Sequence, residues 1–309
     1  MRCSAEPLTP KERPLFGRSL TGNPGLSQPI GGNIDFPAGP GTFRPMTQSP
    51  TEPLSSTSPG GSPGNVDPSE VERFQALAKA WWDPTGKFRP LHQIGPARLT
   101  FVRDELCRHF GRETGGLRPL KDLSVLDVGC GGGLMSEPLT RLGARVTGID
   151  PGEKNVAIAR SHAEPQGLDI DYRVTTVENL VAAGDQYDAV VCLEVIEHVP
   201  DPTLFVKACA DLVRPGGMLV LSTINRTLKS YALAIVAAEY VLQWLPRGTH
   251  QWERFVTPDE ISGHLTTAGL SNPSFRGFAY SPLRDEWKLT SETDVNYLVS
   301  AAKPAASQQ

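Results

Sequence analysis

Residues 125–133 join an apolar strand directly to a glycine-rich loop, Gly-Cys-Gly-Gly-Gly, and this feature constrains the fold more than any other. A strand that passes through such a loop into a helix is the element with which α/β sheets bind nucleotide-like ligands. The next apolar strand, 145–149, is followed by Asp150, which stands 21 residues after Gly129. An acidic residue at this distance is suited to pair with a ribose diol. We therefore expect an α/β fold whose glycine loop binds a nucleoside-containing ligand.

The acidic residue in front of the loop indicates which ligand this is. Asp127 stands two residues before Gly129. A carboxylate there repels a pyrophosphate but accepts hydrogen bonds, directly or through water, from the ammonium group of an amino acid. This disfavours NAD and favours S-adenosylmethionine. We expect the cofactor to contact Asp127, Gly129, Gly131 and Asp150, and we expect Leu193, at the end of a later strand, to cover its adenine.

Strand and helix patterns alternate along the chain, which is typical of a doubly wound, mostly parallel sheet. Strands are expected at 123–128, 145–149, 170–174, 188–192, 217–223, 274–280 and 294–301. Helices are expected at 69–82, 96–110, 133–142, 153–164 and 202–213. The pattern predicts a Rossmann-like, seven-stranded sheet with an antiparallel C-terminal strand, a hairpin at its edge and an N-terminal helical cap. We expect a loop at 83–95 and a helical and loop-like stretch at 226–265.

The first 65 residues differ in composition from the rest of the chain. Twelve are Pro and ten are Gly, a share above the roughly 25–30% that marks low-complexity sequence. We expect a disordered tail at 1–65, one folded domain at 66–303 and a flexible end at 304–309. Met46 precedes the first helix pattern, and we take it as a candidate translation start.

Charge and cysteine content exclude several classes of protein. The chain has 30 basic and 34 acidic side chains, and the basic residues are scattered, so we expect no nucleic-acid partner. No apolar run approaches the roughly 18 residues of a spanning helix, and the N-terminus has no apolar signal sequence. The five cysteines lack CxxC spacing, which indicates reduced thiols rather than disulfides or zinc. These features predict a cytoplasmic protein.

Several short blocks resemble one family. They are Trp-Trp-Asp at 81–83, Pro-Leu-His at 90–92, Pro-Ala-Arg-Leu at 96–99, Pro-Arg-Gly-Thr-His at 246–250 and Asp-Val-Asn-Tyr at 294–297. With the glycine loop, they make residues 66–302 similar to the O-methyltransferases of ubiquinone biosynthesis, which are class I S-adenosylmethionine-dependent methyltransferases. The resemblance implies cofactor contacts at Arg98, Gly129, Asp150 and Leu193. A guanidinium such as that of Arg98 can form a fork with the methionine carboxylate. The family often has Met where Leu193 stands.

The resemblance also implies the reaction, in which a methyl group passes to a phenolic hydroxyl of polyprenylated catechols at two steps of ubiquinone biosynthesis. Glu194, Glu197 and His198 stand at i, i+3 and i+4, which puts them on one face if the segment is helical. By the resemblance, they hold a divalent metal, predicted to be Mg²⁺, that would favour the ionised catechol. In the alternative, no metal takes part, and His198 acts as the base or these side chains are polar packing.

A polyprenyl substrate resides in a lipid bilayer, so the enzyme needs a surface that meets the membrane. Residues 229–247 are apolar and aromatic, with Arg226, Lys229 and Arg247 beside them. The stretch is too short and too interrupted to span, but it can lie in the membrane interface or form a lid at about 226–255. A buried helix is the alternative. We expect peripheral contact with lipid on the inner face of the cytoplasmic membrane, and other ubiquinone-biosynthesis proteins as partners.

Two other functions fit the same fold. One is a methyltransferase that acts on a small phenol without a metal, and sensitivity to a chelator would distinguish it. The other is a regulator that binds S-adenosylmethionine without turnover. The presence of Asp127 and Asp150 together with the Glu-Glu-His cluster disfavours the regulator.

Overall fold

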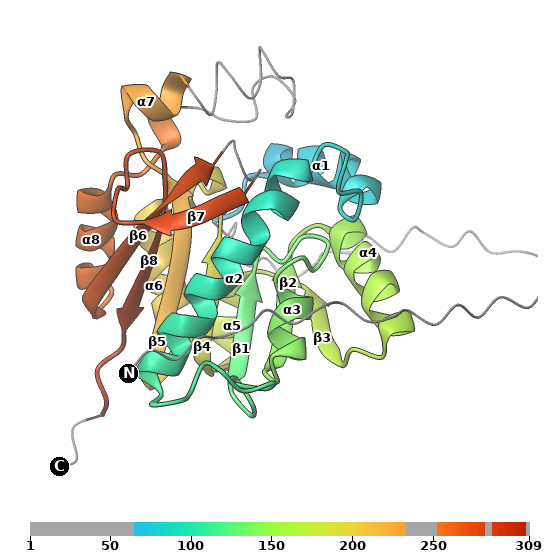
Figure 1. Cartoon of the computed structure of the whole chain (residues 1–309), viewed down its shortest axis with the longest axis horizontal. Coiled ribbons are helices and arrows are strands. Elements are labelled where there is room, and N and C mark those ends of the chain that lie inside the picture. The colour runs from blue at the N-terminus through green and yellow to red at the C-terminus, as the bar shows by residue number, and fades with distance from the viewer. Residues whose placement is uncertain (1–64, 233–251, 282–285, 307–309) are drawn as a thin grey trace, which may run out of the picture. The chain divides into compact units, whose positions relative to one another are not determined.

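The computed structural model describes residues 65–232, 252–281 and 286–306, and these form an α/β domain built on one mixed sheet (Figure 1). The strands are β1 (Ser124–Val128), β2 (Arg145–Asp150), β3 (Ile170–Val174), β4 (Tyr187–Leu193), β5 (Val213–Ile224), β6 (Ser271–Ser281), β7 (Glu286–Thr290) and β8 (Asn296–Ala302). Their order is β3-β2-β1-β4-β5-β8-β6-β7. The doubly wound class I methyltransferase sheet is confirmed, but it has eight strands among the described residues where the sequence predicts seven.

The sheet is parallel from β3 to β5 and antiparallel beyond it. β8 lies antiparallel to β5, and β6 lies antiparallel to both β8 and β7. The two C-terminal strands that the sequence predicts therefore do pair with each other, and β7 is the additional strand. The chain proceeds outwards from β1 to β3 and then returns to place β4 on the other side of β1. This reversal makes a topological switch point between β1 and β4, where α/β sheets bind ligands.

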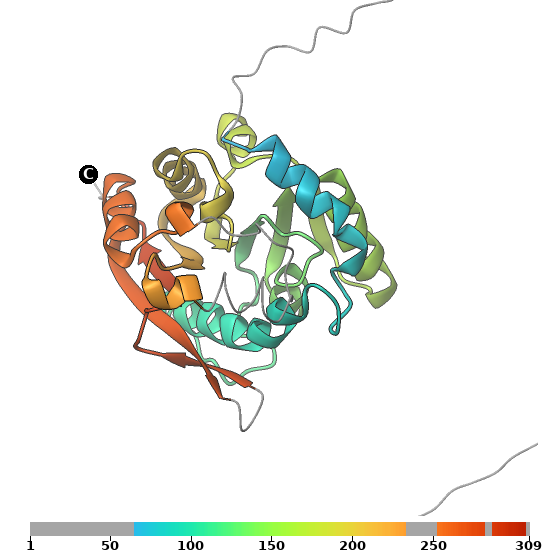
Figure 2. The ribbon, with the colours of Figure 1, turned by 90° about the horizontal axis from the view of Figure 1, so that it is seen from above.

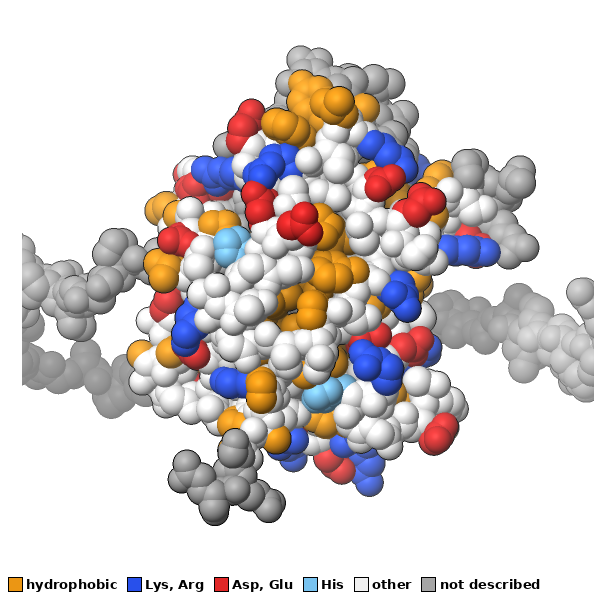
Figure 3. Space-filling view, turned by 90° about the vertical axis from the view of Figure 1, so that its left-hand side faces the viewer, with side chains coloured by type: hydrophobic (Ala, Val, Ile, Leu, Met, Phe, Trp, Pro, Cys, Tyr) orange, Lys and Arg blue, Asp and Glu red, His pale blue; other side chains and the backbone are white. Residues whose placement is uncertain are grey.

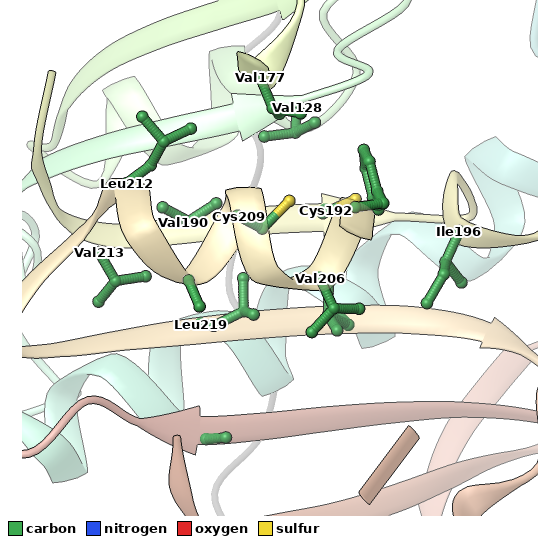
Figure 4. Close-up of a cluster of buried hydrophobic side chains, with 14 of the residues drawn as sticks. Val128, Val177, Val190, Cys192, Ile196, Val206, Cys209, Leu212, Val213 and Leu219 are labelled. Atoms are coloured by element: carbon green, nitrogen blue, oxygen red, sulfur yellow. The ribbon is translucent and has the colours of Figure 1, made fainter. Parts of the chain in front are cut away.

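Helices cover both faces of the sheet. They are α1 (Pro68–Ala76), α2 (Arg89–His109), α3 (Ser136–Arg141), α4 (Glu153–Ala163), α5 (Val177–Ala183), α6 (Pro202–Leu212), α7 (Leu228–Ser230) and α8 (Pro258–Thr267). Because the side chains of a strand alternate, its two sets face opposite sides of the sheet. Val190 and Cys192 of β4 pack with side chains of α5 and α6 (Figure 4) and of α8. Ala189 and Val191 pack with α2 and α3. Two layers of buried apolar side chains, one on each face, thus hold the central strands of the sheet in place.

The N-terminal cap begins with a well-formed helix start. The side chain of Asp67 accepts a hydrogen bond from the Ser69 N–H, and Pro68 occupies the first turn, where its missing N–H costs nothing. α1 ends at Ala76 rather than at 82, and a short 3₁₀ turn, η1 (Ala78–Ala80), follows. The Trp81 and Phe88 rings then stack with 3.9 Å between their centroids. This stack forms a small apolar core beneath the cap.

The predicted loop at 83–95 is too long, because α2 begins at Arg89 and contains Pro96 in its interior. Proline ordinarily breaks a helix, since it lacks an N–H for the preceding turn. Here Ile94, Phe101 and Leu106 lie on the buried side of α2, and their packing on the sheet outweighs the lost hydrogen bond. The sequence analysis also missed α5, a helix of 7 residues.

Several sequence predictions lie outside the described residues. They concern the tail at 1–64, its candidate start at Met46, the last residues 307–309, and most of the proposed lid, 233–251. Of the lid, the structure shows α7 and a 3₁₀ turn at Trp252–Arg254. None of the helices in the described part of the chain is long and apolar enough to cross a membrane.

Tyr297 provides a test of how the C-terminal strands hold the domain. Its side chain is 0% exposed, and its hydroxyl donates a 2.8 Å hydrogen bond to the Val256 carbonyl. We expect Tyr297→Phe to lower the free energy of unfolding by about 1–2 kcal/mol, because the carbonyl loses its partner. Tyr231→Phe, at a ring that is 46% exposed, should change it by less than about 0.5 kcal/mol. Urea unfolding measures both, and equal effects would contradict the prediction.

Candidate functional site

A cavity of about 280 Å³ opens where β1, β2 and β4 end, at the switch point of the sheet. α1 and α2 lie on opposite sides of this end of the sheet (Figure 2), and residues of both line the cavity. Eight of the nine site residues predicted from the sequence line it as well: Arg98, Asp127, Gly129, Asp150, Leu193, Glu194, Glu197 and His198. The ninth, Gly131, lies under Trp81. The structure therefore gathers the predicted cofactor residues and the predicted catalytic residues around one space.

The glycine loop is shaped by two close approaches. Gly129 and Gly131 have φ values of 68° and 52°, in the left-handed region that favours glycine. A Cβ on Gly129 would stand 2.5 Å from the side chain of Val195, and one on Gly131 would stand 2.5 Å from the Trp81 ring. Neither neighbour has room to accommodate it. Glycine is required here because the loop is packed between the end of β4 and the N-terminal cap.

Asp127 is buried at the carboxyl end of β1, with 3% of its surface exposed. Its Oδ2 accepts a 2.5 Å hydrogen bond from the Ser136 hydroxyl. Burial raises the pKa of Asp127 to about 7, and the nearby Asp150 carboxyl adds to this, although the bond from Ser136 opposes it. A carboxylate in this position is stabilised by a cation. The environment therefore suits a positively charged ligand.

Asp150 connects the glycine loop to the cap. Its Oδ2 accepts from the Gly131 N–H at 3.1 Å, and its Oδ1 accepts from the Gly152 N–H at 2.7 Å and from the Asn155 side chain at 3.1 Å. Asn155 in turn accepts a 3.0 Å hydrogen bond from the Trp81 indole. Burial raises the pKa of Asp150 despite these bonds. The chain of contacts fixes the direction of a carboxylate at the end of β2.

Beyond β4, the backbone turns sharply. Leu193 is the last residue of the strand, and Glu194 has a φ of 56°, which is strained for a residue with a side chain. The Glu194 N–H donates to the carbonyl and hydroxyl oxygens of Ser222, and the Ser222 hydroxyl donates to Glu194 Oε1 at 2.8 Å. The same Oε1 lies 2.8 Å from Nη2 of Arg98, which is 7% exposed. Ser222 thus holds the turn that presents Glu194 to Arg98.

Glu197 and His198 belong to a 3₁₀ turn, η3 (Ile196–His198), and they face different partners. Oε2 of Glu197 accepts a 3.0 Å hydrogen bond from the Thr223 hydroxyl, and its Oε1 is buried without a partner among the described residues. Burial raises the pKa of Glu197 to about 8, and the Glu194 charge contributes. Nδ1 of His198 lies 3.0 Å from Oε2 of Glu70 on α1.

Glu194, Glu197 and His198 would share one face only if the segment were helical, and this condition is not met, because the left-handed turn at Glu194 separates it from η3. Within residues 65–232, 252–281 and 286–306, no group of three or more His, Cys, Asp or Glu is arranged to hold a metal ion. Glu194 is paired with Arg98, and His198 is paired with Glu70. Of these three residues, Glu197 alone has a buried carboxylate oxygen without a hydrogen-bond partner in the described part of the chain, as an unmet metal ligand would. The predicted three-residue metal site does not fit this arrangement.

Sequence reasoning missed the residues that orient the predicted ones: Glu70, Ser136, Asn155, Ser222 and Thr223. Ser222 and Thr223 gave a signal, since a Ser-Thr pair is unusual in a strand as apolar as the second half of β5. The pair also stands near the carboxyl end of that strand. Asn155 stands five residues after Asp150, within reach across a strand-to-helix turn. Glu70 gave no signal, because its partner is distant in the sequence.

Comparison with known proteins agrees with this site. A family model described as "Methyltransferase domain" matches residues 126–221. The chain is 54% identical over 240 residues to the ubiquinone biosynthesis O-methyltransferase of Azorhizobium caulinodans, an alignment that covers 78% of this chain and 94% of that one. It is 51% identical over 245 residues to the protein of the same name from Rhizobium leguminosarum bv. trifolii, covering 79% and 97%.

Solved structures are similar in fold. The magnesium protoporphyrin IX methyltransferase of Synechocystis PCC 6803, solved with bound SAH, has a TM-score of 0.52 at 21% identity and covers 76% of this chain and 93% of its own. A plantazolicin methyltransferase, also solved with SAH, has a TM-score of 0.53 at 18% identity and covers 76% and 97%. At this level of identity, the likeness supports the class I methyltransferase fold.

The raised pKa of Asp127 predicts that this residue contributes less to the free energy of unfolding of the ligand-free protein as the pH rises. The carboxyl binds its proton more tightly when folded, with a pKa of about 7 against an ordinary 3.8, so its contribution to stability is lost as the pH rises between these values. We expect the stability of Asp127→Asn relative to the unsubstituted protein to increase between pH 5 and pH 8 by more than about 1 kcal/mol. Urea unfolding at each pH measures this difference. Asp169→Asn, at an exposed carboxyl, is the control; parallel behaviour of the two variants would refute the assignment.

Proposed function

The chain belongs to the family of ubiquinone biosynthesis O-methyltransferases, and on this basis we propose that it methylates polyprenylated catechols. The methyl group of S-adenosylmethionine passes to a phenolic hydroxyl, at both O-methylation steps of the pathway. One observation carries the proposal: a single cavity combines two buried acids beside a glycine loop with a buried arginine and a cluster of polar groups beyond β4. The acids and the arginine suit the cofactor, and the polar groups beyond β4 suit a phenol.

The cofactor assignments follow from the charges of the site. Asp127 is suited to the ammonium group of the methionine moiety, because a cation offsets the cost of a buried carboxylate. Arg98 is suited to its carboxylate, since the Nε atom of this guanidinium is buried without a hydrogen-bond partner among the described residues. Asp150 is suited to the ribose hydroxyls, and Leu193 to the adenine face. Trp81 covers the loop beside them.

The reaction requires the phenol to lose its proton and to face the sulfonium methyl group in line. The oxygen lone pair forms the new O–CH₃ bond as the S–CH₃ bond breaks, and that electron pair stays on sulfur, leaving S-adenosylhomocysteine. The proton of the hydroxyl passes to a base, and we propose His198 for this role. Its ring borders the same cavity as Asp127 and Leu193. An imidazole can accept the proton near neutral pH.

A divalent cation at Glu194 and Glu197 is a second candidate for the activation of the phenol. The orphaned, buried Oε1 of Glu197 beside the Glu194 charge favours it. Mg²⁺, the predicted ion, is commonly held by one or two carboxylates, with substrate oxygens and waters as its other ligands. When bound, such an ion would favour the ionised phenol. His198 is not required as a ligand in this arrangement.

Methyl transfer from labelled S-adenosylmethionine to a short-chain demethylubiquinol tests the proposed function. We expect turnover, and we expect EDTA to lower it by at least about tenfold and added Mg²⁺ to restore it, if the cation contributes as metal ions commonly do. Turnover unaffected by EDTA would assign activation to His198 without a metal. Turnover of a small phenol but not of the demethylubiquinol would indicate the alternative methyltransferase. Tight cofactor binding without turnover on any phenol would indicate the regulator.

We also propose that the end of the domain at α7 meets membrane-held substrate. Apolar side chains gather at this end beside Lys and Arg (Figure 3). Leu228 is 82% exposed and Tyr231 is 46% exposed, with Arg226 and Lys229 adjacent in the sequence. Such a mixture suits the interface of an anionic bilayer. The remainder of the predicted contact, 233–247, lies outside the described residues.

Vesicle sedimentation tests this contact. We expect Leu228→Asp to lower the fraction of protein that sediments with vesicles of phosphatidylglycerol and phosphatidylcholine by at least about twofold, because an acidic side chain disfavours both the apolar and the anionic parts of the interface. Leu117→Asp is the control, since Leu117 is 94% exposed on the loop before β1, away from α7. Equal binding of both variants to the vesicles would contradict a membrane contact through α7.

A further inference from the structure

The histidine assigned as proton acceptor is held by a helix that lies far from it in the sequence. Nδ1 of His198 lies 3.0 Å from Oε2 of Glu70, and both side chains are largely buried, at 14% and 12% exposure. Phe74, one turn further along α1, packs edge-on against the same ring, with 5.2 Å between the centroids. Two contacts from one helix thus fix both the place and the rotation of the imidazole.

The charge state of Glu70 determines what it can offer to the ring. Oε2 of Glu70 contacts both Nδ1 of His198 and the guanidinium of Arg73, and two such donors favour the charged form of the carboxyl group. Glu70 is therefore ionised at neutral pH and can only accept hydrogen bonds. The hydrogen between the two side chains must then be carried by Nδ1 of the imidazole.

We propose that Glu70 is a positioning residue, which holds the neutral ring of His198 in the tautomer with hydrogen on Nδ1 and so presents Nε2 as the nitrogen that acts on the acceptor. The inference rests on the proposed role of His198. A carboxylate behind an imidazole fixes its tautomer and orientation in many catalytic and metal sites. Here that carboxylate comes from the N-terminal cap, which makes α1 part of the active site and not only its cover.

Other links hold α1 in place, so the role of Glu70 can be separated from folding. The Asp201 N–H donates to the side chain of Asn65 at 2.8 Å, just before α1 begins. Arg254 lies 3.6 Å from the carboxylate of Asp67, the residue that caps the helix. Removing the Glu70 charge should leave both links intact. We therefore expect Glu70 variants to keep α1 docked.

Steady-state kinetics with Glu70→Gln form the first test. We expect kcat to fall at least about tenfold, while the KM values for cofactor and acceptor stay within about twofold, because the wrong tautomer affects the proton step and not binding. Glu70→Asp, which keeps the charge, should recover part of the loss. Glu72→Gln removes an exposed carboxylate from the same helix and should match the unsubstituted enzyme. A normal kcat in Glu70→Gln, or a raised cofactor KM with a lowered unfolding temperature, would overturn the proposal.

Nitrogen-15 NMR of the imidazole groups provides a second test that needs no turnover. In alkaline buffer, where the neutral ring is observed, we expect the His198 signal of the full chain to show hydrogen on Nδ1, with His198→Gln identifying the signal. In Glu70→Ala, the hydrogen should move towards Nε2. A ring with hydrogen on Nε2 in the unsubstituted protein would refute the inference. The expected spectra with no methyl transfer would refute the proposed function and leave the pairing of Glu70 with His198 standing.

Discussion

The close contact between Trp81 and the glycine loop is the constraint on which the site depends. The indole lies so near Gly131 and Gly132 that a Cβ on either would stand within 2.5 Å of it. Its N–H is held by Asn155, which also holds Asp150. The cap, the glycine loop and Asp150 are therefore held together by direct contacts. Since α1 leads into Trp81, this contact also places Glu70 beside His198.

The second organising factor is an excess of negative charge around the cavity. Its described lining carries the carboxyl groups of Asp67, Glu70, Asp127, Asp150, Glu178, Glu194 and Glu197, and among the described cationic side chains only Arg98 and the ionisable His198. Burial raises the pKa of Asp127, Asp150 and Glu197, so the surroundings of these acids oppose their ionisation. A ligand with positive sulfonium and ammonium groups offsets this cost on binding. The same groups that destabilise the ligand-free protein therefore favour the cofactor.

Sequence patterns predicted the elements that are determined locally. The strands β1, β2 and β4 and the loop after β1 follow from apolar runs that end at a glycine or an acidic residue. The start of α2 was mispredicted, because packing of its buried face on the sheet outweighs the preference of Pro96 to end a helix. The short helix α5 was missed because its few residues gave too little periodicity. The error at α2 is one of tertiary packing that outweighs a local preference, whereas the error at α5 is one of a weak local signal.

The residues of the site likewise divide into those that local sequence predicts and those that it does not. Asp127, Gly129, Asp150 and Leu193 could be expected to lie together, because each stands at a fixed offset from a strand end. The arrangement of Glu194, Glu197 and His198 could not be predicted, because spacing alone does not reveal that Glu194 adopts a left-handed conformation held by Ser222. Glu70 could not be found at all, because its contact with His198 joins residues that are remote in sequence. Methyltransferases of the same fold are named for acceptors as different as magnesium protoporphyrin IX and plantazolicin. The sheet and the glycine loop therefore do not select the acceptor, and the residues that can do so are those of the cap and of the turn beyond β4.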